Sequence, residues 1–562
     1  MKTKKAKTLD LTNSTPRNCP IDPSHKNGFI SKLFLHTFLA VVLIGGSLAL
    51  FLCAAGGVSY GDSARSMPLN VTANAQFYPT FGTPNSALVT DDDAYVLVSV
   101  TGASTPCPTM SPCPAGSPCP VSPHPTAAST PTGMPANFTT GVQVFSRPDP
   151  TMNPCGGQQI INFPSSRRPK PAQKIDAIQF FPGSPQVSVG AAIERQGAEF
   201  FRLASLNEPC GMDGIIQVPQ YPVINNCNCP DSPPGTFDVA VTPDGHYAFV
   251  ANEYGLMPSP TPTTETGGGS VGVIRVARDA AGGFTRGTRS IEQNNTIYIP
   301  GGDTIPGITM SHDGRYLYVA CEGSAEGINP DTGQKYSDPT NVEHTRNGVV
   351  LCPGCREHPQ GAMGSCDNMA EGGNARNGLL AVIDVDMAIK GMGQASVIRT
   401  ISAGCAPVRA VETADGQHLF VAARGRNEKF PVEHGYQVLV FDVPTLVSDL
   451  PNNAFLGYGD SGGTAPVGMA LFNNETLLAV ANSNRFFANC ECREHPEDCT
   501  ASVAILDVST PGAPTIQQII PNPNNPNSPD FPRNVTVGPD DSTLYVPNAN
   551  AKMLEVITTS AK

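Results

Sequence analysis

Short apolar segments alternate with turn residues along most of the chain, and one unit recurs. The unit is an apolar strand, a turn rich in Asp, Asn and Gly, and a second strand that ends in small residues. Seven copies are found, two of them weak (residues 87–100 and 176–190) and five clear (residues 238–252, 308–321, 409–423, 469–482 and 534–548). A third strand of alternating pattern follows the copies, at residues 141–145, 199–204, 270–276, 379–385, 436–443, 502–508 and 553–558. Fourth strands are fainter, as at residues 397–401 and 515–520.

Four short strands repeated seven times predict an all-β, seven-bladed β-propeller. The last copy has only three strands before the chain stops, and a surplus strand starting near Asn74 precedes the first copy. We predict that this surplus strand pairs with the last copy as its outer strand, which closes the ring and covers an exposed edge. A β-sandwich is the structural alternative, and seven copies of one unit disfavour it.

An apolar segment, residues 33–58, lies near the N-terminus and contains no charged residue. It is long enough to span a bilayer, and the preceding residues 1–32 are rich in Lys and Arg. The positive-inside rule then predicts a cytosolic basic tail, a signal-anchor at residues 33–58, a linker at 59–73 and a propeller at 74–562 outside the cytosol. The predicted location is the cell membrane. A cleaved signal peptide, which would give a secreted protein, and a lipoprotein attached at Cys53 are the alternatives.

The composition narrows the class of protein further. The 562 residues include 55 Gly and 55 Pro, and only 15% are charged. Helical bundles and coiled coils are excluded, because Gly and Pro interrupt long helices. The net charge of −13 argues against a nucleic-acid partner, whose phosphates would be repelled. An extracellular protein or glycan is the kind of ligand that remains.

The second strands and their turns resemble those of the YVTN-repeat (Tyr-Val-Thr-Asn) propellers, which belong to the wider lactonase-like superfamily. The matching residues are 249–252, 318–321, 480–482 and 545–548. The resemblance covers most of residues 74–562 outside the insertions, and it implies a seven-bladed propeller. It also implies lactone hydrolysis as a candidate activity, although the motif itself describes turns and blade packing.

The longest extra segments fall between second and third strands, at residues 101–140, 253–269, 322–377 and 483–500. In a propeller the 2–3 and 4–1 connections lie on one face, and the 1–2 turns and 3–4 connections lie on the other. We therefore expect all four insertions on one face, around the mouth of the central channel, and we name it the insertion face. The opposite face is named the turn face.

The cysteines follow the same distribution. Of the 17, Cys19 lies in the basic tail, Cys53 in the apolar segment, and Cys155 after a third strand. In an exported chain the others are expected to form disulfides that hold the long connections. These fourteen candidates on the insertion face are Cys107, Cys113, Cys119, Cys210, Cys227, Cys229, Cys321, Cys352, Cys355, Cys366, Cys405, Cys490, Cys492 and Cys499.

A metal site is the alternative interpretation of some of these cysteines. The pentapeptide CREHP occurs at residues 355–359 and 492–496. Thiolate and imidazole are the usual structural ligands of zinc. The candidate ligands are Cys352, Cys355, His358, Cys490, Cys492 and His495. No cofactor is favoured, and calcium at Asp91, Asp92 and Asp93 is a weaker alternative because acidic residues are common in such turns.

Polar residues at the start of the first strands are the candidate ligand site, because they can point into the channel. They are Asp238, Arg409, Arg533 and Asn534. Two arginines in a funnel could hold a carboxylate or a phosphate. The alternative is that they bond to neighbouring blades and order the channel.

A hydrolase would also need a general base beside the arginines. Glu343, His344, Glu412, Glu433 and His434 are the candidates, and their spacing singles out none of them. His312 takes the turn position that Pro243 and Pro539 take in other copies, which indicates a structural role. No nucleophile elbow, P-loop or zinc-protease motif is present. The sequence therefore predicts a binding or interaction propeller that acts through its insertion face, with a lactonase-type hydrolase as the alternative.

Overall fold

A computed structural model describes part of the compact unit Pro68–Lys562. The described residues are 71–90, 93–101, 140–147, 160–162, 175–180, 188–193, 197–203, 212–218, 224–226, 229–232, 236–252, 269–276, 291–300, 302–324, 345–346, 349–350, 377–425, 436–448, 453–483, 501–521 and 531–561. Only the backbone is described for residues 160–232, 345–350 and a few positions at strand ends. In this part of the chain no helix is both long enough and apolar enough to cross a membrane, and residues 33–58 lie outside it.

The strands form seven four-stranded antiparallel sheets, which we number I to VII, and side chains are described in every sheet except sheet II. Sheet I contains β2 (Thr83–Val89), β3 (Tyr95–Thr101), β4 (Thr140–Ser146) and β5 (Ile160–Asn162). Sheet II contains β6 (Ile175–Phe180), β7 (Ser188–Ile193), β8 (Gly197–Leu203) and β9 (Met212–Val218). Sheet III contains β12 (Thr236–Val241), β13 (Tyr247–Asn252), β14 (Ser270–Val276) and β15 (Ile291–Tyr298). Sheet IV contains β17 (Gly307–Met310), β18 (Tyr316–Cys321), β22 (Asn377–Asp384) and β23 (Val397–Cys405). Sheet V contains β24 (Pro407–Glu412), β25 (His418–Ala423), β26 (Gln437–Asp442) and β27 (Phe455–Asp460). Sheet VI contains β28 (Pro466–Phe472), β29 (Leu477–Asn482), β30 (Ser502–Asp507) and β31 (Thr515–Pro521). Sheet VII contains β32 (Thr536–Val537), β33 (Thr543–Asn548), β34 (Met553–Ala561) and β1 (Val71–Pro79).

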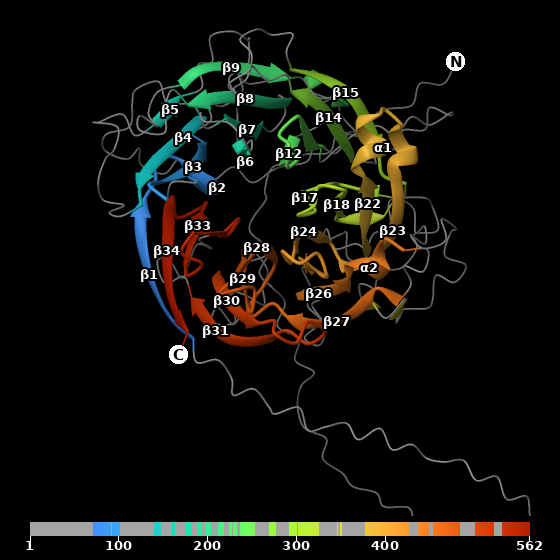
Figure 1. The fold of residues 1–562 in the computed structure, drawn as a ribbon. Helices are drawn as coiled ribbons and strands as arrows, with labels where there is room; N and C mark the ends of the chain where they lie inside the picture. Colours follow the sequence, from blue (N-terminus) through green and yellow to red (C-terminus); the bar gives the residue numbers. More distant parts are fainter. Residues whose placement is uncertain are drawn as a thin grey trace, which may run out of the picture. The chain divides into compact units, whose positions relative to one another are not determined.

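These sheets are arranged as a propeller. The first strands contact one another in the order β2, β6, β12, β17, β24, β28, β32 and back to β2, so they surround a central axis. Figure 1 shows the sheets placed around this axis in the order of the sequence. The prediction of an all-β propeller is confirmed.

The two ends of the propeller meet in sheet VII. Strand β1 pairs antiparallel with β34 along its whole length, from Val71 opposite Ala561 to Pro79 opposite Met553. The predicted closure by a surplus N-terminal strand is therefore confirmed, although the strand begins at Val71 rather than near Asn74. Its pairing covers the edge that β34 would otherwise expose.

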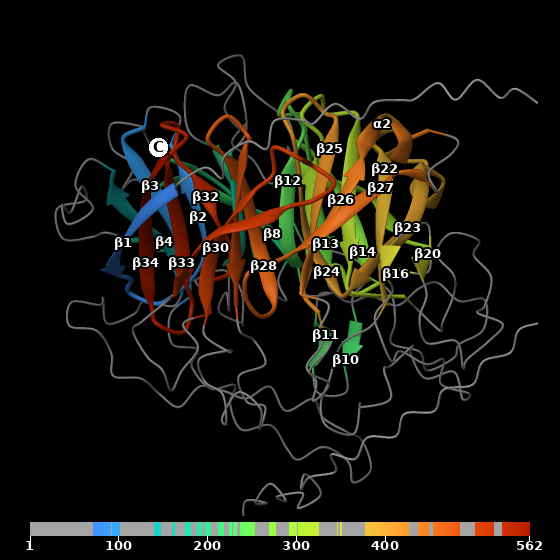
Figure 2. The same ribbon diagram turned by 90° about the horizontal axis from the view of Figure 1, so that it is seen from below.

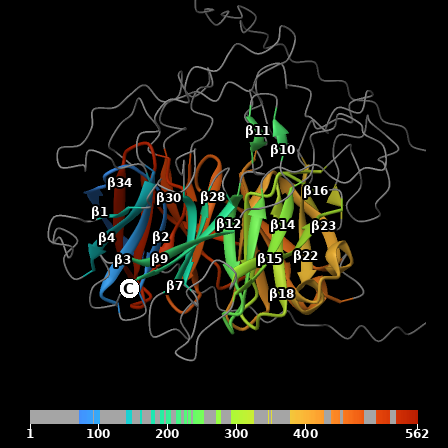
Figure 3. The same ribbon diagram turned by 90° about the horizontal axis from the view of Figure 1, so that it is seen from above.

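The described connections lie on the two faces as expected. Strands β16 (Gly302–Asp303) and β19 (Gly323–Ser324) come from a 4–1 and a 2–3 connection, and they pair with each other. Strands β10 (Ile224–Asn226) and β11 (Cys229–Ser232), from another 4–1 connection, lie with β16 at the same end of the propeller (Figure 3). Helix α2 (Val443–Leu446), a 3–4 connection, lies at the opposite end (Figure 2). Helix α1 (Val385–Ile389) follows β22 in the corresponding position of sheet IV.

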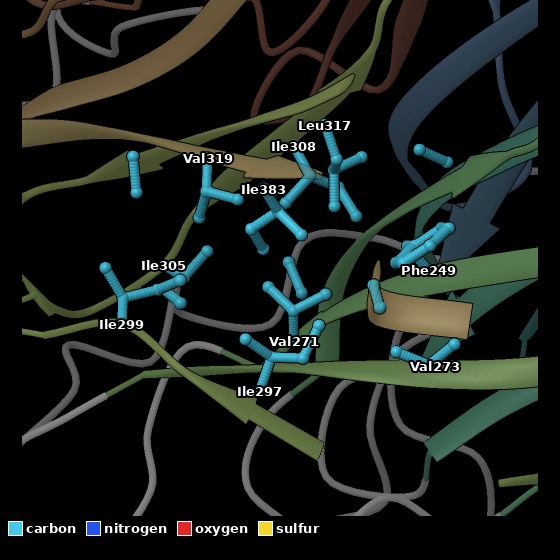
Figure 4. Packing of buried hydrophobic residues seen from close by; sticks show 14 of the residues in the cluster. Phe249, Val271, Val273, Ile297, Ile299, Ile305, Ile308, Leu317, Val319 and Ile383 are labelled. Carbon is cyan, nitrogen blue, oxygen red and sulfur yellow. The ribbon is translucent and has the colours of Figure 1, made fainter. Parts of the chain in front are cut away.

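Neighbouring sheets share apolar layers, because successive residues of a strand point to opposite sides. In β18, Leu317 and Val319 pack toward sheet III, while Tyr318 between them packs toward sheet V. Figure 4 shows the layer between sheets III and IV, in which Phe249 and Val271 meet residues of β17, β18 and β22. The second strands β13, β18, β25 and β29 are buried on both sides, which explains their continuous apolar runs in the sequence, whereas the outer strands β1, β27 and β31 keep exposed positions.

Candidate functional site at the mouth of the channel

The first strands begin with strained backbone. Four non-glycine residues just before them have φ between +50° and +54°, which costs roughly 1 kcal/mol or more each. The carbonyl oxygen of each accepts an N–H at the end of the second strand of the same sheet. The four bonds are Glu322 N to Thr304 O (2.9 Å), Arg424 N to Ala406 O (3.0 Å), Ser483 N to Ala465 O (2.9 Å) and Ala549 N to Phe531 O (3.0 Å). The mouth of sheets IV to VII therefore has one repeated backbone geometry.

A register irregularity follows at the second residue of several first strands. It falls between Thr236 and Asp238 in sheet III and between Pro407 and Arg409 in sheet V. Such bulges turn the neighbouring side chains away from the regular alternation and are common next to functional sites. Asp238 and Arg409 both follow a bulge at the insertion face.

Asp238 and Arg409 form an ion pair that passes over sheet IV. Arg409 Nη1 lies 2.9 Å from Asp238 Oδ2, and the two side chains are 18% and 5% exposed. Asp238 Oδ2 also accepts the N–H of Ile308 in the intervening sheet, at 3.1 Å. Gly307 leaves room for the Arg409 side chain to reach Asp238. A Cβ at this position would lie 3.2 Å from Arg409 Cγ and would overlap the Val408 carbonyl oxygen.

Burial of the Asp238 carboxyl opposes its ionisation, whereas its polar contacts support ionisation. Burial raises the pKa of this carboxyl above its ordinary value, while the positive charge of Arg409 and the N–H groups of Ile308 and Val239 act to lower it. Asp238 therefore has a perturbed pKa and three polar contacts at the channel mouth.

Arg533 contacts two aromatic rings. Its Cζ is 5.4 Å from the ring centroid of Phe237 and 5.3 Å from that of Phe531. Phe237 belongs to sheet III, whereas Arg533 precedes β32 of sheet VII, and these sheets are not neighbours in the ring. The stacking therefore crosses the channel and brings Arg533 to the residue next to Asp238.

Of the four predicted residues, Asp238 and Arg409 thus contact each other, and Arg533 contacts Phe237, the residue next to Asp238. The fourth, Asn534, uses its Oδ1 to accept the N–H of Val535 at 2.9 Å. Its Cα lies against Gly468 of sheet VI, where a Cβ would lie 2.5 Å away. Asn534 therefore fixes the start of β32.

The candidate base Glu412 lies elsewhere, in the junction between sheets IV and V near the turn face. It is 4% exposed and accepts hydrogen bonds from Tyr318 Oη and from the N–H of His312, both at 2.7 Å. Burial, followed by the bond to Glu412, raises the pKa of Tyr318. Glu412 is a structural acceptor between two sheets, which agrees with the structural role predicted for His312. The other base candidates, Glu343, His344, Glu433 and His434, lie outside the described residues.

Sequence reasoning missed a second ion pair on the insertion face. Arg424, which is 1% exposed, binds Glu322 through Nη1 and Oε1. Each residue directly follows the second strand of its sheet, so the pair links sheets V and IV at their equivalent positions. Opposite charges at equivalent positions of successive copies are the signal that could have revealed it.

The remaining chemical predictions are largely outside the described part of the chain. Within that part, no group of three or more His, Cys, Asp and Glu residues could hold a metal ion. Both CREHP segments, Asp91 and Asp92 lie outside it, while Asp93 forms an ion pair with Arg147. Cys321 is fully buried in the layer between sheets III and IV, and its disulfide stays a prediction, like the others.

Comparison with known proteins does not identify this chain. No family model matches it, and no curated protein matches it. Among solved structures, the β-propeller domain of Cps50 (Swd1) from Myceliophteria thermophila matches with a TM-score of 0.42 and 9% identity, over 87% of this chain and 99% of that one. A functionally unknown protein from Desulfotomaculum acetoxidans DSM 771 matches with a TM-score of 0.34 and 13% identity, over 64% of this chain and 71% of that one. These scores carry no functional argument, and the fold rests on the sheet topology itself.

Proposed function

We propose that this protein is a membrane-anchored, exported propeller that binds an extracellular protein or glycan through its insertion face. In this proposal residues 33–58 are the anchor, all seven sheets are blades, and the chain is of the YVTN-repeat, lactonase-like type. The observation that carries it is the occupation of the channel mouth by the protein's own side chains. Asp238 binds Arg409, and Arg533 contacts two aromatic rings.

The contacts of the side chains at the channel mouth favour a binding function over a hydrolytic one. A hydrolytic site needs a base that reaches both water and substrate. Asp238 is 4% exposed and already contacts one guanidinium and two N–H groups, and Glu412 is buried between sheets IV and V. The strained residues before the first strands instead hold the mouth in one fixed backbone geometry. A fixed platform with variable loops is the usual organisation of a binding surface.

One observation favours the alternative, a lactonase-type hydrolase. The pKa of Asp238 is raised beside an arginine at the mouth of a propeller, and perturbed carboxyl groups gather at active sites. In that case Asp238 would be the base and Arg409 or Arg533 would hold the substrate oxygen.

The two functions separate in one experiment on the full chain. Wild-type protein in detergent is assayed for hydrolysis of sugar lactones and for binding to an array of extracellular glycans and proteins, beside Asp238→Asn and a variant with residues 101–140 replaced by a short Gly-Ser linker. We expect binding that the linker variant loses and D238N keeps. Lactone hydrolysis that D238N abolishes without loss of folding would establish the hydrolase instead.

The proposed topology has its own test. Protease added to intact cells should digest the propeller and spare an epitope tag placed before residue 33. Protection of the propeller, or its release into the medium, would contradict the anchored arrangement.

A further inference from the structure

The turn face carries a repeated contact between neighbouring sheets. In sheets V and VI the second residue of the 1–2 turn donates its N–H to a carboxylate of the next turn. Ala414 N lies 2.8 Å and 3.0 Å from the two Glu475 oxygens, and Asn474 N lies 2.5 Å from Asp541 Oδ2. These acidic side chains lie across the surface of their junctions.

The junction between sheets III and IV is filled differently. Its turn has Pro243 at this position, which offers no N–H. Pro243 packs against Gly314 of the next turn, where a Cβ would lie 2.6 Å from the Pro243 ring. This junction is therefore occupied by the proline ring.

The junction between sheets IV and V is left open at its surface. The carboxylate that accepts the N–H of His312 belongs to Glu412, which reaches it from the first strand below and is 4% exposed. The turn above it carries Asp415, whose Oδ1 accepts from its own turn: Thr413 Oγ1 at 2.6 Å and Gln417 N at 3.0 Å. A groove of about 240 Å³ remains between the two turns and α2.

The arginine that lines this groove is paired with a carboxylate of its own turn. Arg315 binds Asp313 Oδ2 at 2.5 Å and lies over the ring of Tyr316, 5.5 Å from its centroid. Asp415 keeps its charge, because the hydrogen bonds from Thr413 and Gln417 lower the pKa of its carboxyl. Its Oδ2 takes no part in those two bonds.

His312 adds a second acceptor. Its Nε2 lies 3.2 Å from the carbonyl oxygen of Glu412, which can only accept, so Nε2 is the protonated nitrogen. In that tautomer Nδ1 carries a lone pair. Pro444 and Val447, in and after α2, supply apolar lining beside these polar groups.

We propose that this groove binds the basic side chain of a lysine or arginine in a peptide. Asp415 and His312 would accept from the charged end, and Pro444 and Val447 would contact the methylene stem. The volume is below that of sites for drug-sized ligands, which suits one side chain. The groove is formed by 1–2 turns and by α2 on the turn face, so the proposal stands independently of the function proposed above.

The test uses the full chain in detergent with four probes: the Nα-acetyl amides of lysine, arginine, norleucine and glutamate. Saturation-transfer NMR and calorimetry should show binding of the lysine and arginine probes only. Asp415→Asn keeps the Oδ1 acceptor and removes the charge, and should weaken binding about tenfold or more. The matched control is Asp244→Asn, because Asp244 accepts equivalent bonds from Thr242 Oγ1 (2.5 Å) and His246 N (2.9 Å) in a turn whose junction is filled.

A second variant, Ala414→Leu, should block the groove sterically, since Ala414 lines it and is exposed. Both groove variants should lose binding while D244N keeps it. The proposal is wrong if neither basic probe binds wild-type protein, if the glutamate probe binds as well as they do, or if D244N weakens binding as much as D415N.

Discussion

Replacement of Glu412 should separate a structural acceptor from a catalytic base. In Glu412→Leu, the buried hydroxyl of Tyr318 and the N–H of His312 both lose a charged acceptor at 2.7 Å. A hydrogen bond to a charged group contributes about 1.5–3 kcal/mol. We therefore expect the free energy of unfolding to fall by about 3–6 kcal/mol. Glu412→Gln keeps one acceptor oxygen and should lose roughly half as much.

Tyr318→Phe provides the matched control. Alone it removes one partner of Glu412, and in the double variant with Glu412→Leu no hydroxyl is left unsatisfied. The double variant should be more stable than the sum of the single effects by about 1–2 kcal/mol. Urea unfolding is followed by far-UV circular dichroism and tyrosine fluorescence, since the chain has 13 Tyr and no Trp.

Two results would refute this reasoning. One is a loss below about 1 kcal/mol for Glu412→Leu, and the other is additivity of the two substitutions within about 0.5 kcal/mol. Lactone hydrolysis that Glu412→Gln abolishes at unchanged stability would make Glu412 a catalytic residue.

Three further predictions concern the mouth, the turns and the cysteines. Gly307→Val should lower the free energy of unfolding by about 2–4 kcal/mol, because its side chain would overlap the Val408 carbonyl oxygen and displace Arg409. A urea midpoint equal to that of wild type would contradict the close contact at Gly307. Since the folded pKa of Asp415 lies below its ordinary value of 3.8, its contribution to stability is present above that pH and is lost as the pH falls through the folded pKa. The thermal midpoint of Asp415→Asn should therefore depend less on pH below about 4 than that of wild type, and parallel curves would disprove the assignment. Non-reducing peptide mapping should find the fourteen cysteines assigned to the insertion face in disulfides and Cys155 unpaired, and a bridge to Cys155 would break the topological argument.

Much of the fold could be predicted because its determinants are local. Each repeat contains its own alternating strands and its own turn, as in Thr413 to His418, where the Asp415 side chain closes the turn. The surplus strand could be predicted as well, since the last repeat lacks an outer strand. Its starting residue could not, because Val71 is fixed by pairing with Ala561 at the far end of the chain.

The candidate site was predicted by position and not by contact. The start of the first strands points to Asp238, Arg409 and Arg533, and the structure joins the first two in an ion pair. Their partners were missed. Asp238 and Arg409 are 171 residues apart, and no spacing rule connects them. In the sequence Phe237 looks like any apolar strand residue. Only the structure shows that it lies in the bulge between Thr236 and Asp238, outside the regular pairing of the strand.

By itself, the sequence determined most strands of the four-stranded sheets, their order and the closing strand, because alternation and turn chemistry act over a few residues. The tertiary structure alone decided which side chains meet. The ring places sheets III and V on either side of a glycine, so Arg409 can reach Asp238, and it brings Arg533 across the channel to Phe237. The tertiary structure also decided the open groove on the turn face. There Glu412, a first-strand residue, accepts the N–H of His312, whereas turn residues fill this role in the junctions of sheets V with VI and VI with VII. Such distances arise only when the ring is closed, and so they leave no mark on the spacing of residues along the chain.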